Sequence, residues 1–289
     1  MKKGNTLDLG STWDLFSHQR LSEFNKLVYP VVSRRSGGLS IGINLNPDRN
    51  CNFRCVYCQV DRALPVPTVT LSITQIEKEL GNWFNVLSSN SWTYQNHLLK
   101  DISIAGDGEP TCIKELPEVL RLVAGLKARY GFESYKLVLF TNGSKIDRSD
   151  LTESLTLFFQ QGGEIWFKLD FWNQESLQSI NRTRLSSEQL VENLIAMGNR
   201  HPLVIQSCLF RWGKEEYDAQ KYQPYVNLLR YILSKGTQIK LLQLYTLARI
   251  PENEKAQPWS NEEMDQLGSF IDSQVDIKTE IYYGQGKPE

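Results

Sequence analysis

The chain has 289 residues, and its 32 basic and 33 acidic side chains give a formal net charge of −1. This length suffices for one large domain of the α/β barrel type. The balanced charge, with no basic tract, does not support a nucleic-acid partner, although a local basic patch would still permit one. No apolar run approaches the roughly 18 residues of a membrane span, so we expect no membrane partner.

Six short runs of mostly β-branched or apolar residues, ended by Gly, Asp or Asn, predict six strands. The predicted strands are Gly38–Leu45, Lys100–Ala105, Lys136–Thr141, Glu164–Leu169, Leu203–Leu209 and Gln238–Leu244. Patterns with helical periodicity lie between them. Because alternating strand and helix units build a parallel sheet with helices outside, we predict an α/β fold.

The helices are predicted from apolar stripes and capping residues. The first opens with a capping box of Thr74 and Glu77. Its apolar stripe comprises Ile76, Leu80, Trp83, Phe84 and Leu87. The same periodicity predicts helices over residues 116–127, 151–159 and 222–233. Ser186 caps another helix, and a helix capped by Ser260 precedes a strand-like segment, Val275–Tyr282, near the end of the chain.

Three cysteines, Cys51, Cys55 and Cys58, follow the first predicted strand with the spacing C-x3-C-x2-C. Thiolates select soft metals and iron–sulfur clusters. Three thiolates on one loop can hold three irons of a cubane and leave the fourth iron without a protein ligand. An open metal position binds a small molecule directly, as in catalytic zinc sites. The spacing therefore predicts a cluster that does chemistry.

Zinc and disulfides fit these cysteines less well. A zinc site needs a fourth ligand at regular spacing, but Cys112 and Cys208 are isolated and the three histidines form no pair. An odd count of five cysteines argues against disulfides, as does the polar segment Gly4–Gly10 where a signal peptide would be apolar. We expect a cytoplasmic protein. A non-enzymatic iron–sulfur or zinc-binding protein remains an alternative.

A glycine-rich loop, Gly106-Asp107-Gly108-Glu109-Pro110, ends the second predicted strand. In α/β barrels the chemistry lies where the strands end, so this loop and the cysteine loop should meet above the sheet. Taken alone, Gly-Asp-Gly is also common in plain tight turns.

The cysteine loop, including Tyr57 before its last cysteine, resembles the cluster loop of the radical S-adenosylmethionine (SAM) superfamily, and the glycine loop resembles that superfamily's GGEP loop. The resemblance implies a (β/α)6 partial TIM barrel over residues 36–246. Short extensions, N-terminal over 1–35 and C-terminal over 247–289, would pack on it.

The same resemblance implies the cofactors and the reaction. Cys51, Cys55 and Cys58 would bind a [4Fe–4S] cluster, and the loop Gly106–Pro110 would receive the amino group of SAM. An electron from a flavodoxin- or ferredoxin-like donor would cleave SAM to methionine and a 5′-deoxyadenosyl radical. That radical would abstract hydrogen from a substrate that the sequence does not identify.

Other strand ends supply further candidates. Asn142 either contacts a ligand or turns the chain with Gly143. Lys168 and Asp170 share one strand face; the resemblance implies that they hold the carboxylate and ribose of SAM, and a simple ion pair is the alternative. The resemblance also implies that Leu244, at the end of the sixth strand, packs on adenine.

Cys208 lies on the fifth predicted strand, on the same face as Gln206. Some radical enzymes use a cysteine as hydrogen-atom donor, which makes Cys208 a candidate catalytic residue. A lone cysteine on a strand is also commonly a small buried apolar residue. Cys112, directly after the glycine loop, has the same two interpretations.

Three stretches narrow the resemblance to a branch related to the wyosine-forming tRNA enzymes. They are Gly106–Thr111, Ile180-Asn181-Arg182 and Gln243–Arg249. The wyosine enzymes carry additional upstream cysteines for a second cluster that handles pyruvate, whereas no cysteine precedes Cys51 here. A wyosine-type tRNA modification is therefore kept as the alternative activity.

Overall fold

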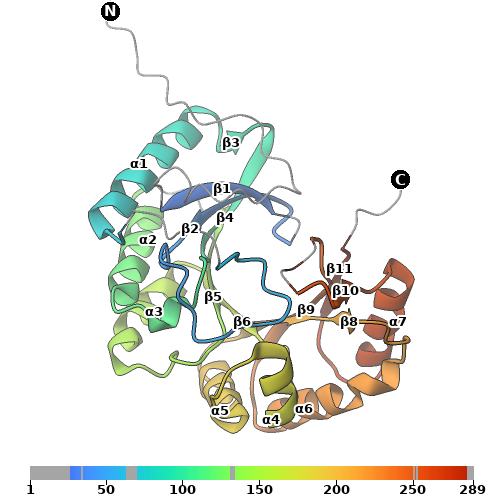
Figure 1. Cartoon of the computed structure of the whole chain (residues 1–289). Coiled ribbons are helices and arrows are strands. Elements are labelled where there is room, and N and C mark those ends of the chain that lie inside the picture. The colour runs from blue at the N-terminus through green and yellow to red at the C-terminus, as the bar shows by residue number, and fades with distance from the viewer. Residues whose placement is uncertain are drawn as a thin grey trace, which may run out of the picture.

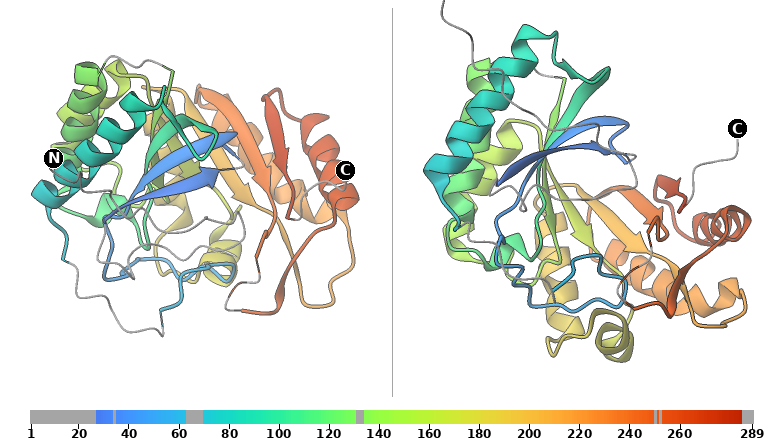
Figure 2. Two further views of the ribbon diagram at one scale, coloured as in Figure 1. Left: turned by 90° about the horizontal axis from the view of Figure 1, so that it is seen from above. Right: turned by 45° about the horizontal axis from the view of Figure 1, so that its top comes forward.

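A curled sheet with helices on its convex side forms the body of the protein (Figures 1 and 2). The computed structural model describes residues 27–33, 35–62, 70–130, 134–249, 251 and 253–284. In spatial order the sheet strands are β1 (Val28–Ser33), β2 (Gly38–Ile43), β4 (His97–Ile104), β5 (Lys136–Thr141), β6 (Gly163–Lys168), β7 (Leu203–Cys208), β9 (Ile239–Tyr245) and β11 (Thr279–Tyr282). The short β3 (Thr93–Tyr94) pairs with β4.

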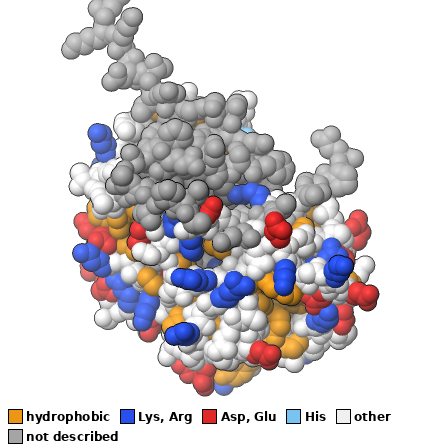
Figure 3. Space-filling view, in the orientation of Figure 1, with side chains coloured by type: hydrophobic (Ala, Val, Ile, Leu, Met, Phe, Trp, Pro, Cys, Tyr) orange, Lys and Arg blue, Asp and Glu red, His pale blue; other side chains and the backbone are white. Residues whose placement is uncertain are grey.

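The six predicted strands correspond to β2, β4, β5, β6, β7 and β9, which pair in parallel and in chain order. Helices cross between successive strands. They are α1 (Ile73–Ser89), α2 (Leu116–Tyr130), α3 (Thr152–Gln160), α5 (Ser187–Gly198) and α6 (Gln223–Ser234), and α7 (Asn261–Asp272) follows β9. Their outer sides carry charged side chains, visible around the rim of the space-filling view (Figure 3).

The two edges of this half-barrel are extended by strands from outside the six predicted units. At one edge β1 pairs antiparallel with β2, and at the other β11 pairs in parallel with β9. The predicted strand-like segment Val275–Tyr282 thus forms a strand only over its last four residues. Residues 1–26 of the predicted N-terminal extension lie outside the described residues, and the domain boundaries stay a prediction.

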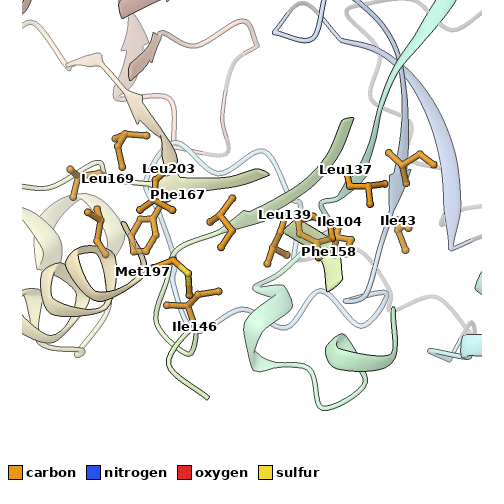
Figure 4. Packing of buried hydrophobic residues seen from close by; sticks show 14 of the residues in the cluster. Ile43, Ile104, Leu137, Leu139, Ile146, Phe158, Phe167, Leu169, Met197 and Leu203 are labelled. Carbon is orange, nitrogen blue, oxygen red and sulfur yellow. The ribbon is translucent and has the colours of Figure 1, made fainter. Parts of the chain in front are cut away.

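The main core lies between the sheet and its helices (Figure 4). Strand residues such as Ile104, Leu139 and Phe167 pack against Phe158 of α3 and Met197 of α5. Full burial of such a side chain contributes roughly 1.5–3 kcal/mol, so this layer supplies much of the stability. Alternate residues point the other way, into the barrel.

A second, small apolar layer fills the interior of the barrel. It is built from Val138, Trp166 and Val204, with Phe140 and Leu241 packed against it. The rings of Phe140 and Trp166 meet edge to face at 5.0 Å. These positions come from four neighbouring strands, so the layer forms a floor across the barrel.

Helix starts follow the expected capping chemistry with one exception. Ser186 and Ser260 cap α5 and α7 as predicted. The predicted capping box of Thr74 is wrong, because α1 begins at Ile73 and the side chain of Ser72 accepts from the N–H of Gln75. Ser72 competes with Thr74 because it also has a Gln three residues later. Within the described part of the chain, no helix combines the length and apolar character needed to cross a bilayer.

Candidate active site

A cavity of about 430 Å³ opens at the carboxyl ends of the parallel strands. Ligand pockets commonly measure about 300–1,000 Å³. Of the residues predicted for the site, the cavity is lined by Cys51, Cys55, Tyr57, Cys58, Gly106, Asp107, Gly108, Glu109, Pro110, Asn142, Lys168 and Asp170. The cysteine loop, coloured blue in Figure 1, crosses in front of the half-barrel. The fold therefore brings together all but two of the predicted site residues.

The cysteine loop is anchored to a one-turn π-helix, η4 (Leu177–Asn181). The N–H groups of Arg54 and Val56 donate to the carbonyl oxygens of Asn181 and Ile180, both at 2.9 Å. The side-chain amide of Asn181 donates to Cys55 Sγ at 3.3 Å. One short segment thus holds both the backbone and a sulfur of the loop.

Each of the three cysteine sulfurs accepts a hydrogen bond from nitrogen. Cys51 Sγ accepts from the N–H of Phe53 at 3.4 Å, Cys55 Sγ from Asn181, and Cys58 Sγ from Arg62 Nη2 at 3.8 Å. Such donors favour the negatively charged form of sulfur. Burial is the larger effect in the protein without metal, and it raises the pKa of Cys51 to about 11 and that of Cys55 to about 12. Binding of a metal would therefore release protons from these thiols.

This donor set fits an iron–sulfur cluster better than a single zinc ion. Across the described ranges, no three His, Cys, Asp or Glu side chains converge on a position for one metal ion. Zinc requires such convergence, commonly of four ligands. In a cubane each cysteine binds a different iron, so the three sulfurs need only surround a common space.

The carboxylate of Glu109 braces the glycine loop. Its Oε1 accepts from the N–H and the hydroxyl of Thr111 at 3.0 and 2.6 Å and from the hydroxyl of Thr141 at 2.6 Å, and its Oε2 accepts from the N–H of Asn142 at 2.7 Å. Burial raises the pKa of Glu109, and these four donors oppose that shift. With its oxygens already occupied, Glu109 holds β5 and the loop in register.

Close packing explains the two glycines. A Cβ on Gly106 would lie 2.3 Å from Asn44 Oδ1, and one on Gly108 would lie 1.8 Å from the carbonyl oxygen of Asn50. Asn44 also clamps the residue between them, because its Nδ2 donates to Asp107 Oδ2 at 2.7 Å and its Oδ1 accepts from the N–H of Asp107 at 3.1 Å. The glycine loop therefore lies directly against the segment that leads into the cysteines.

A polar cluster forms the opposite wall. Lys168 Nζ lies 3.3 Å from Asp170 Oδ1 and donates to the hydroxyl of Tyr245, and the hydroxyl of Tyr57 donates to Asp170 Oδ2. The N–H of Cys208 also donates to Asp170 Oδ1, at 2.6 Å. Burial, with Asp170 nearby, raises the pKa of Tyr57 well above its usual value, so Tyr57 is a neutral donor. The ion pair considered for Lys168 and Asp170 is thus formed.

Asn142 connects the two loops. Its Nδ2 donates to Asn52 Oδ1 at 2.9 Å, and its Oδ1 accepts from the N–H of Ser144 at 3.0 Å. The Asn52 amide in turn donates to the hydroxyl of Ser144 at 2.7 Å. Asn142 therefore turns the chain after β5, as one of its two predicted roles required, while still lining the cavity.

Comparison with known proteins identifies the family. No model of a protein family matches the chain. UPF0026 protein slr1464 of Synechocystis is 32% identical over 228 residues, which is 74% of each chain. This chain belongs to the UPF0026 family.

UPF0026 protein MJ1312 of Methanocaldococcus jannaschii is 27% identical over 175 residues, and a Brachyspira hyodysenteriae protein named GTPase Obg is 23% identical over 261 residues. The chain spans 49% and 34%, respectively, of the length of those two relatives.

Solved structures share the fold of this UPF0026 chain. A radical SAM methyltransferase from Sphaerobacter thermophilus superposes with a TM-score of 0.60 and 12% identity, over 90% of this chain and 78% of that one. A spore photoproduct lyase mutant gives 0.56 and 9%, over 95% and 87% of the chains. TYW1 with a lysine-pyruvate adduct gives 0.50 and 15%, over 83% and 74%. The predicted α/β partial barrel is therefore confirmed as the fold, in the form that these solved structures share.

Two predicted residues of the UPF0026 chain do not line the cavity. Leu244 is fully buried in the core between sheet and helices, and its neighbour Tyr245 lines the cavity instead. Cys208 is buried against Leu247 and Ala256, and burial strongly raises the pKa of its thiol. Leu244 is therefore corrected to a core residue, and Cys208 packs beside the cavity.

Several residues of the UPF0026 site escaped sequence reasoning. Arg62 reaches Cys58 and donates to the carbonyl oxygens of Arg49 and Asp107. Asn44 and Asn181 clamp the two loops from other parts of the chain. Asn181 belongs to one of the three stretches that resemble the wyosine-type branch. No local sequence pattern indicates its contact with Cys55, which lies 126 residues away in the chain.

Proposed function

We propose that this chain is a radical SAM enzyme that binds one [4Fe–4S] cluster through Cys51, Cys55 and Cys58 and binds SAM beside it. The observation that carries the proposal is that the three cysteines and the glycine loop line one cavity at the carboxyl ends of parallel strands. When bound, the reduced cluster and SAM supply hydrogen-atom abstraction through a 5′-deoxyadenosyl radical. The substrate is a separate question.

Around the cysteines, this chain's own residues fix position and charge. The N–H groups of Phe53, Asn181 and Arg62 point at the sulfurs and would stabilise negative charge there. Because Arg62 also bonds the carbonyl of Asp107, it ties the last cysteine to the glycine loop. Other backbone carbonyl groups of that loop would receive the amino group of SAM.

The opposite wall offers paired charges to the rest of SAM. Lys168 would pair with the carboxylate of SAM, and Asp170 would accept hydrogen bonds from its ribose hydroxyls. These contacts would replace part of the ion pair that Lys168 and Asp170 now form with each other. Tyr57 and Tyr245 hold these two side chains in place. Tyr57 also meets the ring of Phe210 at 5.7 Å, which closes this side of the cavity and limits water near the reacting groups.

The reductant of this enzyme would be a flavodoxin- or ferredoxin-like protein. Arg54 and Arg182 are exposed beside the cysteine loop, and neither pairs with an acidic side chain in the described part of the chain. Lys and Arg side chains form a band across the face shown in Figure 3. This charge would attract an acidic electron donor and speed its encounter.

A wyosine-type tRNA modification is the alternative activity. The likeness to TYW1 and the basic side chains on the active face favour it. Residues 1–50 of this sequence contain no cysteine that could hold a second cluster of the wyosine type. A tRNA substrate predicts binding that weakens steeply with salt. A non-enzymatic iron–sulfur or zinc protein would show neither tRNA binding nor SAM cleavage.

Reductive cleavage of SAM tests the main proposal. Anaerobically reconstituted protein with dithionite should form 5′-deoxyadenosine and methionine slowly without added substrate. Gly108→Ala should abolish this cleavage while most iron is retained, because its Cβ collides with the carbonyl of Asn50. Gly81→Ala is the matched control, since a Cβ there meets nothing within 4 Å. A fully loaded, reducible cluster that never yields 5′-deoxyadenosine would refute the enzyme.

A further inference from the structure

Arg35 places a cation in the cavity that has no ion pair among the described residues. It lies in the turn that joins β1 to β2, and its guanidinium carbon is 5.6 Å from the ring centroid of Phe140 and 5.0 Å from that of Tyr245. No ion pair or hydrogen bond of this guanidinium group occurs among the described residues, whereas Lys168 is paired with Asp170. The two rings hold the group in position and leave its N–H donors available.

Gln206 places an unpaired acceptor in the same cavity. Its side chain is fully buried, and its Nε2 donates to Gln243 Oε1 at 2.6 Å. Its own Oε1 has no hydrogen-bond partner within the ranges that the structure describes. A buried amide oxygen without a partner is costly, so such atoms in native proteins commonly meet a ligand or a water molecule.

Arg35 and Gln206 belong to one end of the cavity. Gln243 Nε2 lies 3.5 Å from the hydroxyl of Tyr282, and that hydroxyl donates to the carbonyl oxygen of Arg35 at 3.3 Å. Gln206 also pairs across the sheet with Lys168. Two side chains, Gln243 and Tyr282, therefore link the amide of Gln206 to the backbone of Arg35, and both Arg35 and Gln206 line the cavity.

The surroundings of this end define what it accepts. Phe140 belongs to the apolar floor of the barrel, so the space beneath the guanidinium group is closed. Two charged groups lie near Arg35. Lys168 is paired with Asp170 and also contacts the ring of Tyr245. The buried Asp101 has a pKa that burial raises and that the charge of Arg35 partly lowers. This end of the cavity thus offers a guanidinium group with no ion pair among the described residues, one hydrogen-bond acceptor and an apolar base.

We propose that this end of the cavity binds a substrate that carries a carboxylate or phosphate group on Arg35 and a hydroxyl or amino donor on Gln206. A guanidinium group binds either oxyanion through two parallel hydrogen bonds, and the contacts of Arg35 with two rings hold this group in place. The proposal rests on the proposed function for the reaction that follows, since the rest of the substrate would extend toward the cysteine end.

Small hydroxy acids test the two contacts separately. The probes are glycolate, 3-hydroxypropionate and 4-hydroxybutyrate, with acetate, propionate and butyrate as matched acids, their neutral amides, and inorganic phosphate with glycerol phosphate. Calorimetric titration of the cluster-loaded, SAM-bound protein measures the dissociation constants. At least one hydroxy acid or glycerol phosphate should bind about tenfold more tightly than its matched acid or inorganic phosphate, the factor that one good hydrogen bond provides.

Variants assign each part of the affinity. Arg35→Gln should weaken every acid at least about tenfold, and Arg35→Lys should recover part of it because the charge remains. Gln206→Leu should remove the advantage of the hydroxy acid and leave the affinity of the plain acid unchanged. Arg121→Gln, on the exposed side of α2, is the matched control and should change nothing. Whichever of the carboxylates and phosphates binds identifies the oxyanion.

Acids that bind no better than their amides, or an Arg35→Gln protein with unchanged affinity for acids, would overturn the proposal. Thermal unfolding checks each variant, and if Arg35→Gln does not fold, the Gln206→Leu comparison decides on its own. Failure of the enzyme proposal would be seen differently, as wild-type protein that holds no iron or never cleaves SAM. Failure of this proposal leaves iron content and cleavage intact.

Discussion

The side-chain amide of Asn181 donates a hydrogen bond to the sulfur of Cys55 over 3.3 Å. Asn181 is almost fully buried, and its Oδ1 has no partner in the described residues, so the amide is committed to the sulfur. Its carbonyl oxygen also accepts from the N–H of Arg54. A residue between β6 and α5 thereby supports the loop that follows β2.

Asn181→Leu should lower the reduction potential of the cluster. A donor to sulfur stabilises the more negative, reduced state, and a net hydrogen bond of about 1 kcal/mol corresponds to about 40 mV for one electron. A redox titration followed by electron paramagnetic resonance measures this shift. Asn227→Leu, on the exposed side of α6, is the control. An unchanged potential in a fully loaded Asn181→Leu protein would contradict a role for this bond.

Replacing Cys51, Cys55 or Cys58 singly by Ala should abolish the cluster. Anaerobically reconstituted wild-type protein should hold about four irons, and each variant should hold little or none, because the remaining two thiolates bind a cubane poorly. Iron and sulfide analysis with absorption spectroscopy measures this. Cys112→Ala is the control and should retain the cluster, since Cys112 is exposed and does not line the cavity. Stoichiometric zinc without iron–sulfur absorbance would support the metal-binding alternative.

Stability in acid should depend on Glu164 at the amino end of the barrel. Burial alone would raise the pKa of Glu164, but the hydrogen bonds from Lys240 and Trp166 and the charge of Lys136 outweigh it and hold this pKa below its usual range. A carboxyl group with a lowered folded-state pKa stabilises the protein above its unfolded pKa of about 4.5, and this contribution is lost as the pH falls through the folded value.

Glu164→Gln should therefore destabilise the protein at pH 7 and make less difference as the pH falls below about 4.5. Urea unfolding at a series of pH values measures the free energy in both proteins. Glu188→Gln, on the exposed part of α5, is the control and should stay within about 0.5 kcal/mol of wild type. A difference between wild type and Glu164→Gln that stays constant from pH 7 to pH 3 would contradict the lowered pKa.

Cys208→Ser should affect stability rather than chemistry. Cys208 packs against Leu247 and Ala256, does not line the cavity, and has Tyr245 as the hydrogen-bond partner of its thiol. A serine hydroxyl there would lose apolar contacts while staying buried, so the unfolding free energy should fall by about 1–2 kcal/mol. Denaturant unfolding tests this, with Cys112→Ser as the exposed control. Once a substrate is known, formation of 5′-deoxyadenosine without product in a stably folded Cys208→Ser protein would reinstate Cys208 as a hydrogen-atom donor.

Local sequence determined the strands, the helices between them and the cysteine and glycine loops. Apolar residues that repeat every two or every 3.6 positions indicate which face of a strand or helix is buried. This pattern can be read without knowing which element packs against that face. The spacing of Cys51, Cys55 and Cys58 likewise predicts a loop whose three thiolates surround one group. Parallel strands then bring the loops after β2 and β4 to the same edge of the sheet.

Only the tertiary structure decided which side chains face the cavity and which contact each other from afar. The sixth strand was predicted to end at Leu244 and ends at Tyr245. Successive side chains of a strand point to opposite faces of the sheet, so Leu244 faces the core and its neighbour Tyr245 faces the cavity. Contacts such as Asn181 with Cys55, or the turn holding Arg35 with Tyr245, join distant segments that the curled sheet brings together. No local pattern encodes them, since they depend on how the edges of the sheet approach each other in space.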